Sequence, residues 1–185
     1  KDVEEEAKKR GAAMLARVAA HPEPLQQKAI KIRQDLPYFW LSEEDNIILC
    51  GKIDWLQYHE ETDSVHILDF KTGKFDEDPD SLQLPIYTLL VANVQPRAID
   101  GASYWYLDRD DAPTPMTLPS GEDAKRRIME IAQKIQLARK LERFVCRQKD
   151  GCRNCRPYEA ILAGRAEFVG TGGYNQDIYI SPIDN

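Results

Sequence analysis

Apolar runs separated by polar breaks mark the middle of the chain, across residues 46–87. Two runs rich in Ile, Leu, Val and aromatic residues, 46–56 and 65–74, have the composition of β-strands. The polar residues 60–63 between them, Glu-Glu-Thr-Asp, are typical of a turn. We therefore expect a β-hairpin here, with the rest of the chain organised around it.

Helical periodicity marks three further segments: residues 1–20, a segment that begins after a cap at Asp80 or Ser81, and residues 121–145. The first ends at His21-Pro22, because proline disfavours helical geometry in the residue before it. The last has an apolar stripe formed by Ile128, Ile131, Ile135, Ala138 and Leu141. All three are expected to be amphipathic helices that pack on a sheet.

Two more segments alternate like strands, residues 29–36 and 102–107, and residues 38–41 are an apolar run expected in the core or at a strand edge. Residues 108–119 predict a loop rich in Asp and Pro. Strands interspersed with helices predict an α/β fold, a mixed central sheet flanked by helices.

The chain has 185 residues, of which 42% are hydrophobic and 30% charged, which suits one globular domain. We assign residues 1–163 to this domain, including a cysteine-bearing segment at 146–155, and residues 164–185 to a C-terminal extension. No membrane span or signal peptide is visible, so a cytoplasmic protein without a membrane partner is expected. The chain starts at Lys1 in an apparent helix, and we expect it to be truncated at the N-terminus.

The central hairpin carries an unusual set of charges. Asp69 and Lys71 are two residues apart on one expected strand, so they share a face and lie roughly 7 Å apart along it. Asp54 is expected to join them from the neighbouring strand. Two acids and a lysine held this close need compensation, which a divalent cation would supply. The alternative is that Asp69 and Lys71 form an ordinary ion pair at the protein surface.

The ordered motifs Gly51-x-x-Asp54, Asp69-x-Lys71 and Gln83-x-x-x-Tyr87 resemble those of the PD-(D/E)XK nuclease superfamily. The resemblance is closest to its RecB-like branch, which includes the AddB-type helicase-nucleases and the CRISPR-adaptation nucleases. It implies a restriction-endonuclease-like core and metal-dependent phosphodiester hydrolysis, with a role in recombination, repair or defence.

The resemblance also implies a role for each matched residue. Asp54, Asp69 and the backbone carbonyl of Phe70 would bind Mg²⁺ or Mn²⁺, and Lys71 would position or polarise the attacking water or contact the phosphate. Gln83 and Tyr87 would orient the site and touch the nucleic acid. All five side chains are expected to be catalytic residues.

One family feature has no clear match in this chain. RecB-like nucleases carry an additional His or Glu on a helix upstream of the Gly-x-x-Asp strand. The upstream candidates are Glu4, Glu5, Glu6, His21 and Glu23, and none matches well. The missing residue is expected to precede Lys1.

Three of the four cysteines, Cys146, Cys152 and Cys155, follow the long helix. Their position resembles that of the ligands of a [4Fe–4S] cluster in several RecB-like nucleases, although the short gap comes second here rather than first. A zinc site and unliganded thiols are the other options. Cys50 is expected to be a core cysteine that shares a strand face with Asp54.

The net charge of −6 is unevenly distributed. Residues 125–156 contain eleven Lys or Arg and three acids, a local charge of +8, and residues 43–80 a local −9. Arg126, Lys134, Arg143 and Arg147 are therefore expected to contact phosphates, unless this is only a solvated helix face.

The leading interpretation is a Mg²⁺- or Mn²⁺-dependent deoxyribonuclease that acts on single strands or ends of DNA, as its relatives do. A helicase or another recombination subunit would be its partner. The alternative is a non-catalytic nucleic-acid-binding module within a helicase-nuclease assembly. A zinc-ribbon interaction domain is a third, remote interpretation.

Overall fold

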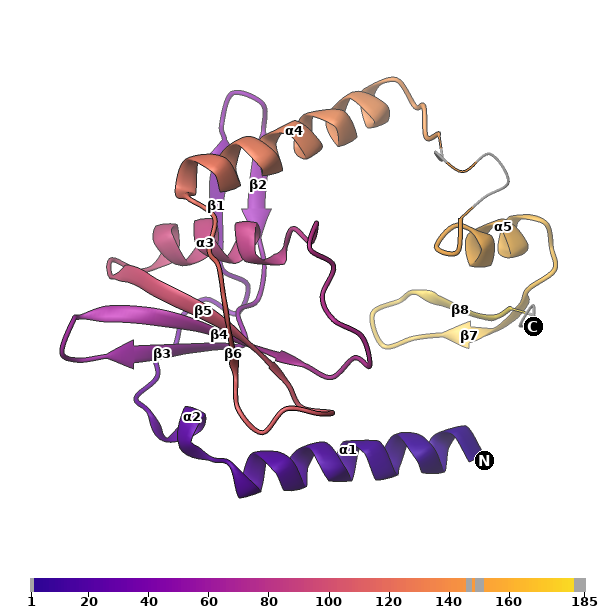
Figure 1. Cartoon of the computed structure of the whole chain (residues 1–185). Helices are drawn as coiled ribbons and strands as arrows, with labels where there is room; N and C mark the ends of the chain where they lie inside the picture. The colour runs from indigo at the N-terminus through magenta and orange to yellow at the C-terminus, as the bar shows by residue number, and fades with distance from the viewer. Residues whose placement is uncertain (1, 146–147, 149–151, 182–185) are drawn as a thin grey trace. The chain divides into compact units, whose positions relative to one another are not determined.

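The computed structural model describes residues 2–145, 148 and 152–181 of the chain (Figure 1). The described chain forms two compact units, Lys1–Ile135 and Gln136–Asn185. All matched motif residues lie in the first unit. The two units are treated separately below.

The first unit contains both layers of an α/β fold. Its elements are α1 (Asp2–Ala20), α2 (Glu23–Gln26), β1 (Tyr38–Ser42), β2 (Ile47–Cys50), β3 (Trp55–His59), β4 (Ser64–Lys71), α3 (Gln83–Val94), β5 (Ala98–Tyr106), β6 (Thr114–Met116) and most of α4 (Gly121–Lys140). The expected mixed sheet flanked by helices is confirmed.

The central sheet has the strand order β3-β4-β5-β6. Strands β4 and β5 are parallel and are joined through α3, whereas the two outer pairs are antiparallel (Figure 1). Strand β4 is buried along most of its length, which explains its nearly continuous apolar sequence. Its last residues, Asp69 and Lys71, lie beside Tyr104 and Tyr106 of β5.

Helix α3 packs on one face of this sheet. Val65 and Ile67 of β4 share the main core with apolar side chains of α3, namely Leu84, Tyr87 and Val91. Because side chains alternate along a strand, Asp69 and Lys71 continue the same face toward the first turn of α3. The expected shared face of these two charges is confirmed.

The expected hairpin partner differs from the prediction. Residues 46–56 do not form one strand, because β2 pairs with β1 and ends at Cys50, and β3 begins only at Trp55. The chain leaves β2 close to α3, where a Cβ on Gly51 would lie 3.0 Å from Cδ1 of Leu90. Asp54 therefore precedes β3 rather than lying on it, and its predicted alternation with Cys50 is wrong.

Other element boundaries also differ from the prediction. Residues 29–36 form no strand, because beyond the bridge of Ala29 to Gln57 the chain bends before Pro37. Helix α3 begins at Gln83, later than a cap at Asp80 or Ser81 would place it, and the Ser81 hydroxyl accepts the Gln83 N–H at 3.2 Å. Helix α4 ends at Lys140, short of residue 145.

The second unit contains α5 (Arg156–Leu162) and the antiparallel strands β7 (Glu167–Thr171) and β8 (Asp177–Ile180). The expected extension is thus a hairpin, in which the rings of Phe168 and Tyr179 lie 5.6 Å apart. Within the described part of the chain, no helix combines the length and apolar character required to cross a membrane.

The buried position of Leu90, beside Gly51, leads to a prediction for the free energy of unfolding. Leu90 is fully buried, so Leu90→Ala should lower the free energy of unfolding by about 2–5 kcal/mol. Ile135→Ala, at a site that is 55% exposed, should change it by only about 0.5 kcal/mol. Urea denaturation of both variants measures the difference, and equal losses would contradict this description of the core.

Candidate active site

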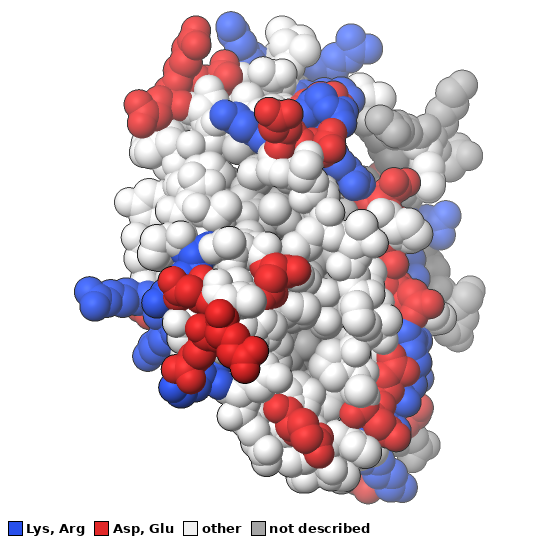
Figure 2. Space-filling view, turned by 60° about the vertical axis from the view of Figure 1, so that its left-hand side comes forward, with Lys and Arg blue, Asp and Glu red and all other residues white. Residues whose placement is uncertain are grey.

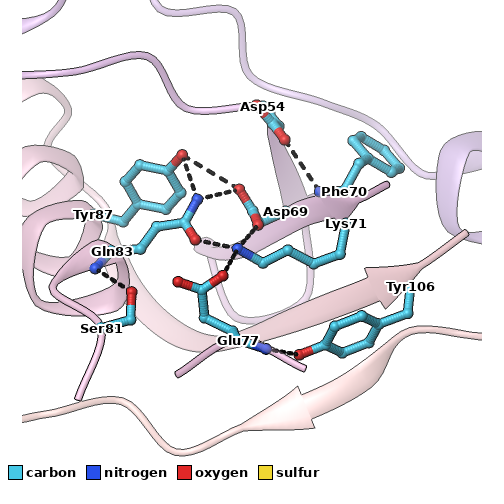
Figure 3. Close-up of polar contacts among 9 residues, drawn as sticks. All are labelled: Asp54, Asp69, Phe70, Lys71, Glu77, Ser81, Gln83, Tyr87 and Tyr106. Atoms are coloured by element: carbon cyan, nitrogen blue, oxygen red, sulfur yellow. Dashed lines mark hydrogen bonds and ion pairs between the residues drawn. The ribbon is translucent and has the colours of Figure 1, made fainter. Parts of the chain in front are cut away.

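An ion pair between Asp69 and Lys71 lies at the end of β4 (Figure 3). The Lys71 Nζ atom is 3.0 Å from Oδ2 of Asp69. The Asp69 side chain is almost fully buried and that of Lys71 mostly so. Two opposite charges are therefore held together in an environment with little water, where their attraction is screened only weakly.

Helix α3 supplies the hydrogen bonds that hold Asp69. Gln83 Nε2 donates to Asp69 Oδ1 at 2.8 Å, and the Tyr87 hydroxyl donates to the same oxygen at 3.3 Å. Gln83 Nε2 also donates to the Tyr87 hydroxyl oxygen at 3.1 Å. The spacing of four residues places both side chains one above the other on the helix, facing β4.

The Lys71 ammonium is surrounded by acceptors. Besides Asp69, it donates to Glu77 Oε2 at 2.7 Å and to Gln83 Oε1, and it lies 4.4 Å from the centre of the Tyr104 ring. Glu77 was not among the expected site residues. It lies in a loop without periodicity, and its position depends on the Tyr106 hydroxyl, which accepts the Glu77 N–H at 3.1 Å.

Burial and pairing set the protonation of these groups. Burial raises the pKa of Asp69, and the charge of Lys71 opposes that shift without cancelling it. Burial works against the charge of Lys71, but Glu77 and Asp69 outweigh it and raise the Lys71 pKa. Burial also raises the pKa of Tyr87 to about 12. At neutral pH Lys71 is therefore a cation and Tyr87 a neutral donor.

Asp54 reaches the same edge from the segment before β3. Its Oδ2 accepts the N–H of Phe70 at 3.1 Å. The pairing of β3 with β4 ends where Trp55 faces Leu68, so Phe70 has no partner residue in β3. Because the N–H and C=O of one strand residue point to the same side, the Phe70 carbonyl faces this edge too. Asp54 also contributes to raising the Asp69 pKa, which reflects its proximity.

Comparison with known proteins identifies the family. The model of the PD-(D/E)XK nuclease superfamily matches residues 2–161. The chain belongs to this superfamily. No curated protein and no solved structure gives a significant match. Asp69-Phe70-Lys71 has the D-x-K form that gives the superfamily its name, and members of the superfamily are generally hydrolytic nucleases.

PD-(D/E)XK nucleases typically use Mg²⁺ or Mn²⁺, and the residues at this edge fit such an ion. Asp69 Oδ2 is buried and has no well-oriented hydrogen-bond donor. With Asp54 and the Phe70 carbonyl it offers the oxygen donors that hard cations prefer. No group of three or more His, Cys, Asp or Glu among the described residues could hold a metal. An ion here would therefore depend on two carboxylates, a backbone carbonyl and water.

The remaining candidates lie outside this arrangement. Glu4 pairs with Lys8, Glu6 lies 3.8 Å from Lys74, and His21 lies 3.6 Å from Asp111. None of these contacts involves the Asp69 carboxylate, so the upstream residue of RecB-like nucleases is not assigned within the described residues.

The cysteine expectations have mixed outcomes. Cys50 is exposed on β2, so its predicted core position is wrong. The thiols of Cys152 and Cys155 lie 3.4 Å apart, while Cys146 lies outside the described residues. The iron–sulfur and zinc assignments gain no support from this geometry.

The basic residues of α4 are partly neutralised by their own helix. Arg126 lies 2.7 Å from Asp123 and 3.8 Å from Glu130. On the face drawn in Figure 2, Lys and Arg side chains lie among Asp and Glu rather than in one continuous patch. Arg147 lies outside the described residues, and the expected contacts of Lys134 and Arg143 with phosphates remain predictions.

The raised pKa of Asp69 generates a prediction for stability. The folded carboxyl binds its proton more tightly than the unfolded one, so its contribution to stability is full below about pH 3.9 and is lost as the pH rises through the folded pKa. Asp69→Asn does not titrate.

The stability of Asp69→Asn relative to the parent should therefore be more favourable at about pH 7.5 than at about pH 4. Urea denaturation of both proteins at the two pH values measures the change, and titration of groups that do not interact with Asp69 cancels in the comparison. A difference that is constant or reversed with pH would contradict the proposed burial of the charge.

Proposed function

We propose that the chain is a Mg²⁺- or Mn²⁺-dependent nuclease domain of the RecB-like branch that hydrolyses phosphodiester bonds of DNA. The observation that carries this proposal is the buried carboxylate of Asp69, paired with Lys71 and aligned by Gln83 and Tyr87. Gln83 and Tyr87 both donate to Oδ1, which leaves Oδ2 of Asp69 without a well-oriented donor and available to a cation.

A divalent ion held by Asp54, Asp69 and the Phe70 carbonyl would lower the pKa of a bound water and neutralise charge on the phosphate. The chain's own contribution is to place the oxygen donors at one edge of the sheet. Phe70 links two of them, because its N–H binds Asp54 and its neighbour in sequence is Asp69.

Lys71 acts as a fixed positive charge in this proposal. Its raised pKa argues against a role as a general base, since a charged ammonium has no lone pair. The ammonium can instead donate to the attacking water or to a phosphate oxygen where negative charge develops. Gln83 fixes both partners, because its amide nitrogen binds Asp69 and its amide oxygen accepts from Lys71.

The RecB-like assignment is supported by the contacts of the Gln83-x-x-x-Tyr87 motif with the D-x-K aspartate. The preference for single strands or ends and a partnership with a helicase or other recombination subunit follow from that assignment. So does a role in recombination, repair or defence.

Two variants separate the roles of Asp69 and Lys71. Asp69→Ala removes an oxygen donor and a negative charge, so it should abolish Mn²⁺ binding and cleavage together. Lys71→Ala removes a positive charge, so it should leave Mn²⁺ binding unchanged or tighter while cleavage falls roughly 10²–10³-fold. Calorimetric Mn²⁺ titration and a cleavage assay on single-stranded DNA, both on the full-length protein, provide the measurements.

Glu61→Ala and Lys28→Ala, at exposed positions outside the site and outside the loop that follows β4, serve as matched controls and should resemble the parent. Loss of Mn²⁺ binding in Lys71→Ala, or cleavage equal to the parent's, would show that the assigned role is wrong. A parent protein that binds DNA without cutting it would favour the non-catalytic module.

A further inference from the structure

The loop between β4 and α3, residues 72–82, is called the acidic loop here because it contains Asp76, Glu77, Asp78 and Asp80. Residues 72–80 are exposed except for Glu77, which is half-buried, and the Phe75 ring is 86% exposed. No apolar side chain of these residues is buried in the core. Polar contacts therefore hold the acidic loop in place.

Three of its acids each pair with a different cation from elsewhere in the first unit. Glu77 binds the Lys71 ammonium, and Asp76 binds the guanidinium of Arg109, which follows β5. Arg127 of α4 donates to the backbone carbonyl of Asp80 and lies 3.8 Å from its carboxylate. The acidic loop thus contacts three positive groups, one of which is the site lysine.

Two of the three cations, Lys71 and Arg109, also make contacts outside the acidic loop. The Arg109 guanidinium lies 4.0 Å from the centre of the Tyr106 ring, and Lys71 is seated over Tyr104. Arg127 projects from α4 beside a hollow of about 440 Å³ that Tyr104 and the acidic loop itself also line. Lys71 and Arg109 therefore keep their contacts with the tyrosine rings when the acidic loop moves away, and Arg127 keeps its place on α4.

We propose that Lys71, Arg109 and Arg127 are the phosphate-binding groups for the substrate strand, and that the acidic loop fills this site until nucleic acid displaces it. Carboxylate and phosphate oxygens are both anionic acceptors, and arginine pairs with either in the same fork geometry. The inference rests on the proposed nuclease function, because Lys71 is the group shared with the reaction.

For two of the three pairs, those of Asp76 and Asp80, the energetics favour exchange over permanent closure. The Asp76 and Asp80 side chains are 79% and 98% exposed, and ion pairs at such positions contribute little. A phosphate backbone contacts several cations at once and releases counterions when it binds. Replacement of the acidic loop by a strand therefore needs no disruption of the apolar core.

The test measures binding of a fluorescein-labelled single-stranded DNA 20-mer by anisotropy, in EDTA so that no divalent ion contributes and nothing is cut. The loop variant Asp76→Asn/Glu77→Gln/Asp80→Asn should bind roughly tenfold more tightly, since three competing ion pairs are removed. Asp76→Asn/Asp80→Asn keeps Glu77 and should show a smaller gain, which guards against misfolding of the triple variant.

A matched control removes the same charge elsewhere. Glu43→Gln/Glu44→Gln/Glu61→Gln changes three exposed acids in the turns after β1 and β3 and should leave binding nearly unchanged. A gain equal to that of the loop variant would overturn the inference, because general repulsion would then explain both. If the loop variant bound DNA no more tightly than the parent, or more weakly, the inference would also be overturned. The role of the acidic loop would then be to position Lys71.

The cations are tested in the same assay. Arg109→Ala and Arg127→Ala should each weaken binding and reduce the slope of log affinity against log salt by about 0.7, the value for one phosphate of a single strand. Arg126→Ala, whose charge is paired within α4, should change the slope less. Unchanged slopes for Arg109→Ala and Arg127→Ala would contradict the proposed site.

The proposed phosphate site and the proposed nuclease function can be disproved independently. If the parent binds as expected but does not cut in Mg²⁺ or Mn²⁺, the nuclease function is wrong while the phosphate site stands. If the parent cuts but the loop and arginine variants bind like the parent, the function stands and the phosphate site is wrong.

Discussion

The buried pairing of Asp69 with Lys71 is the interaction on which the rest of the site depends. A buried carboxylate with a raised pKa is costly, and the structure offsets that cost with the ammonium and with donors from Gln83 and Tyr87. The ammonium needs acceptors in turn, which Glu77 and Gln83 supply. β4 and α3 contribute two groups each, and the loop between them contributes Glu77, to a network that is favourable only when complete.

The path of the backbone after Gly51 is also constrained, by close packing against α3. The chain leaves β2 so close to Leu90 that a side chain on Gly51 would press against it, and it then places Asp54 beside the free N–H of Phe70. Asp54 is brought to Asp69 by this path and not by strand alternation. The same edge carries two acids, so positive charge from a divalent ion or from Lys71 relieves their repulsion.

The sequence predicted what depends on local pattern. The shared face of Asp69 and Lys71 followed from strand periodicity, and the pairing of Gln83 with Tyr87 followed from helical spacing. The break between β2 and β3 was missed because residues 51–54, Gly-Lys-Ile-Asp, were assigned to one strand with the apolar runs on either side. The chain leaves β2 where Gly51 approaches Leu90, a contact between residues far apart in the sequence. The role of Glu77 was missed because long-range contacts with Lys71 and Tyr106, not its neighbours in sequence, position it. Cys50 was expected in the core, yet β2 turns it outward.

Anomalous diffraction at the manganese edge, from crystals of this chain soaked in Mn²⁺, tests the central claim most directly. The claim is that the end of β4 is a metal site made by Asp54, Asp69 and the Phe70 carbonyl. The expected result is one strong peak with oxygen distances of about 2.0–2.4 Å to these three residues, with Lys71 nearby but not bound to the ion. A peak that contacts neither carboxylate, or none at saturating Mn²⁺, would contradict the claim.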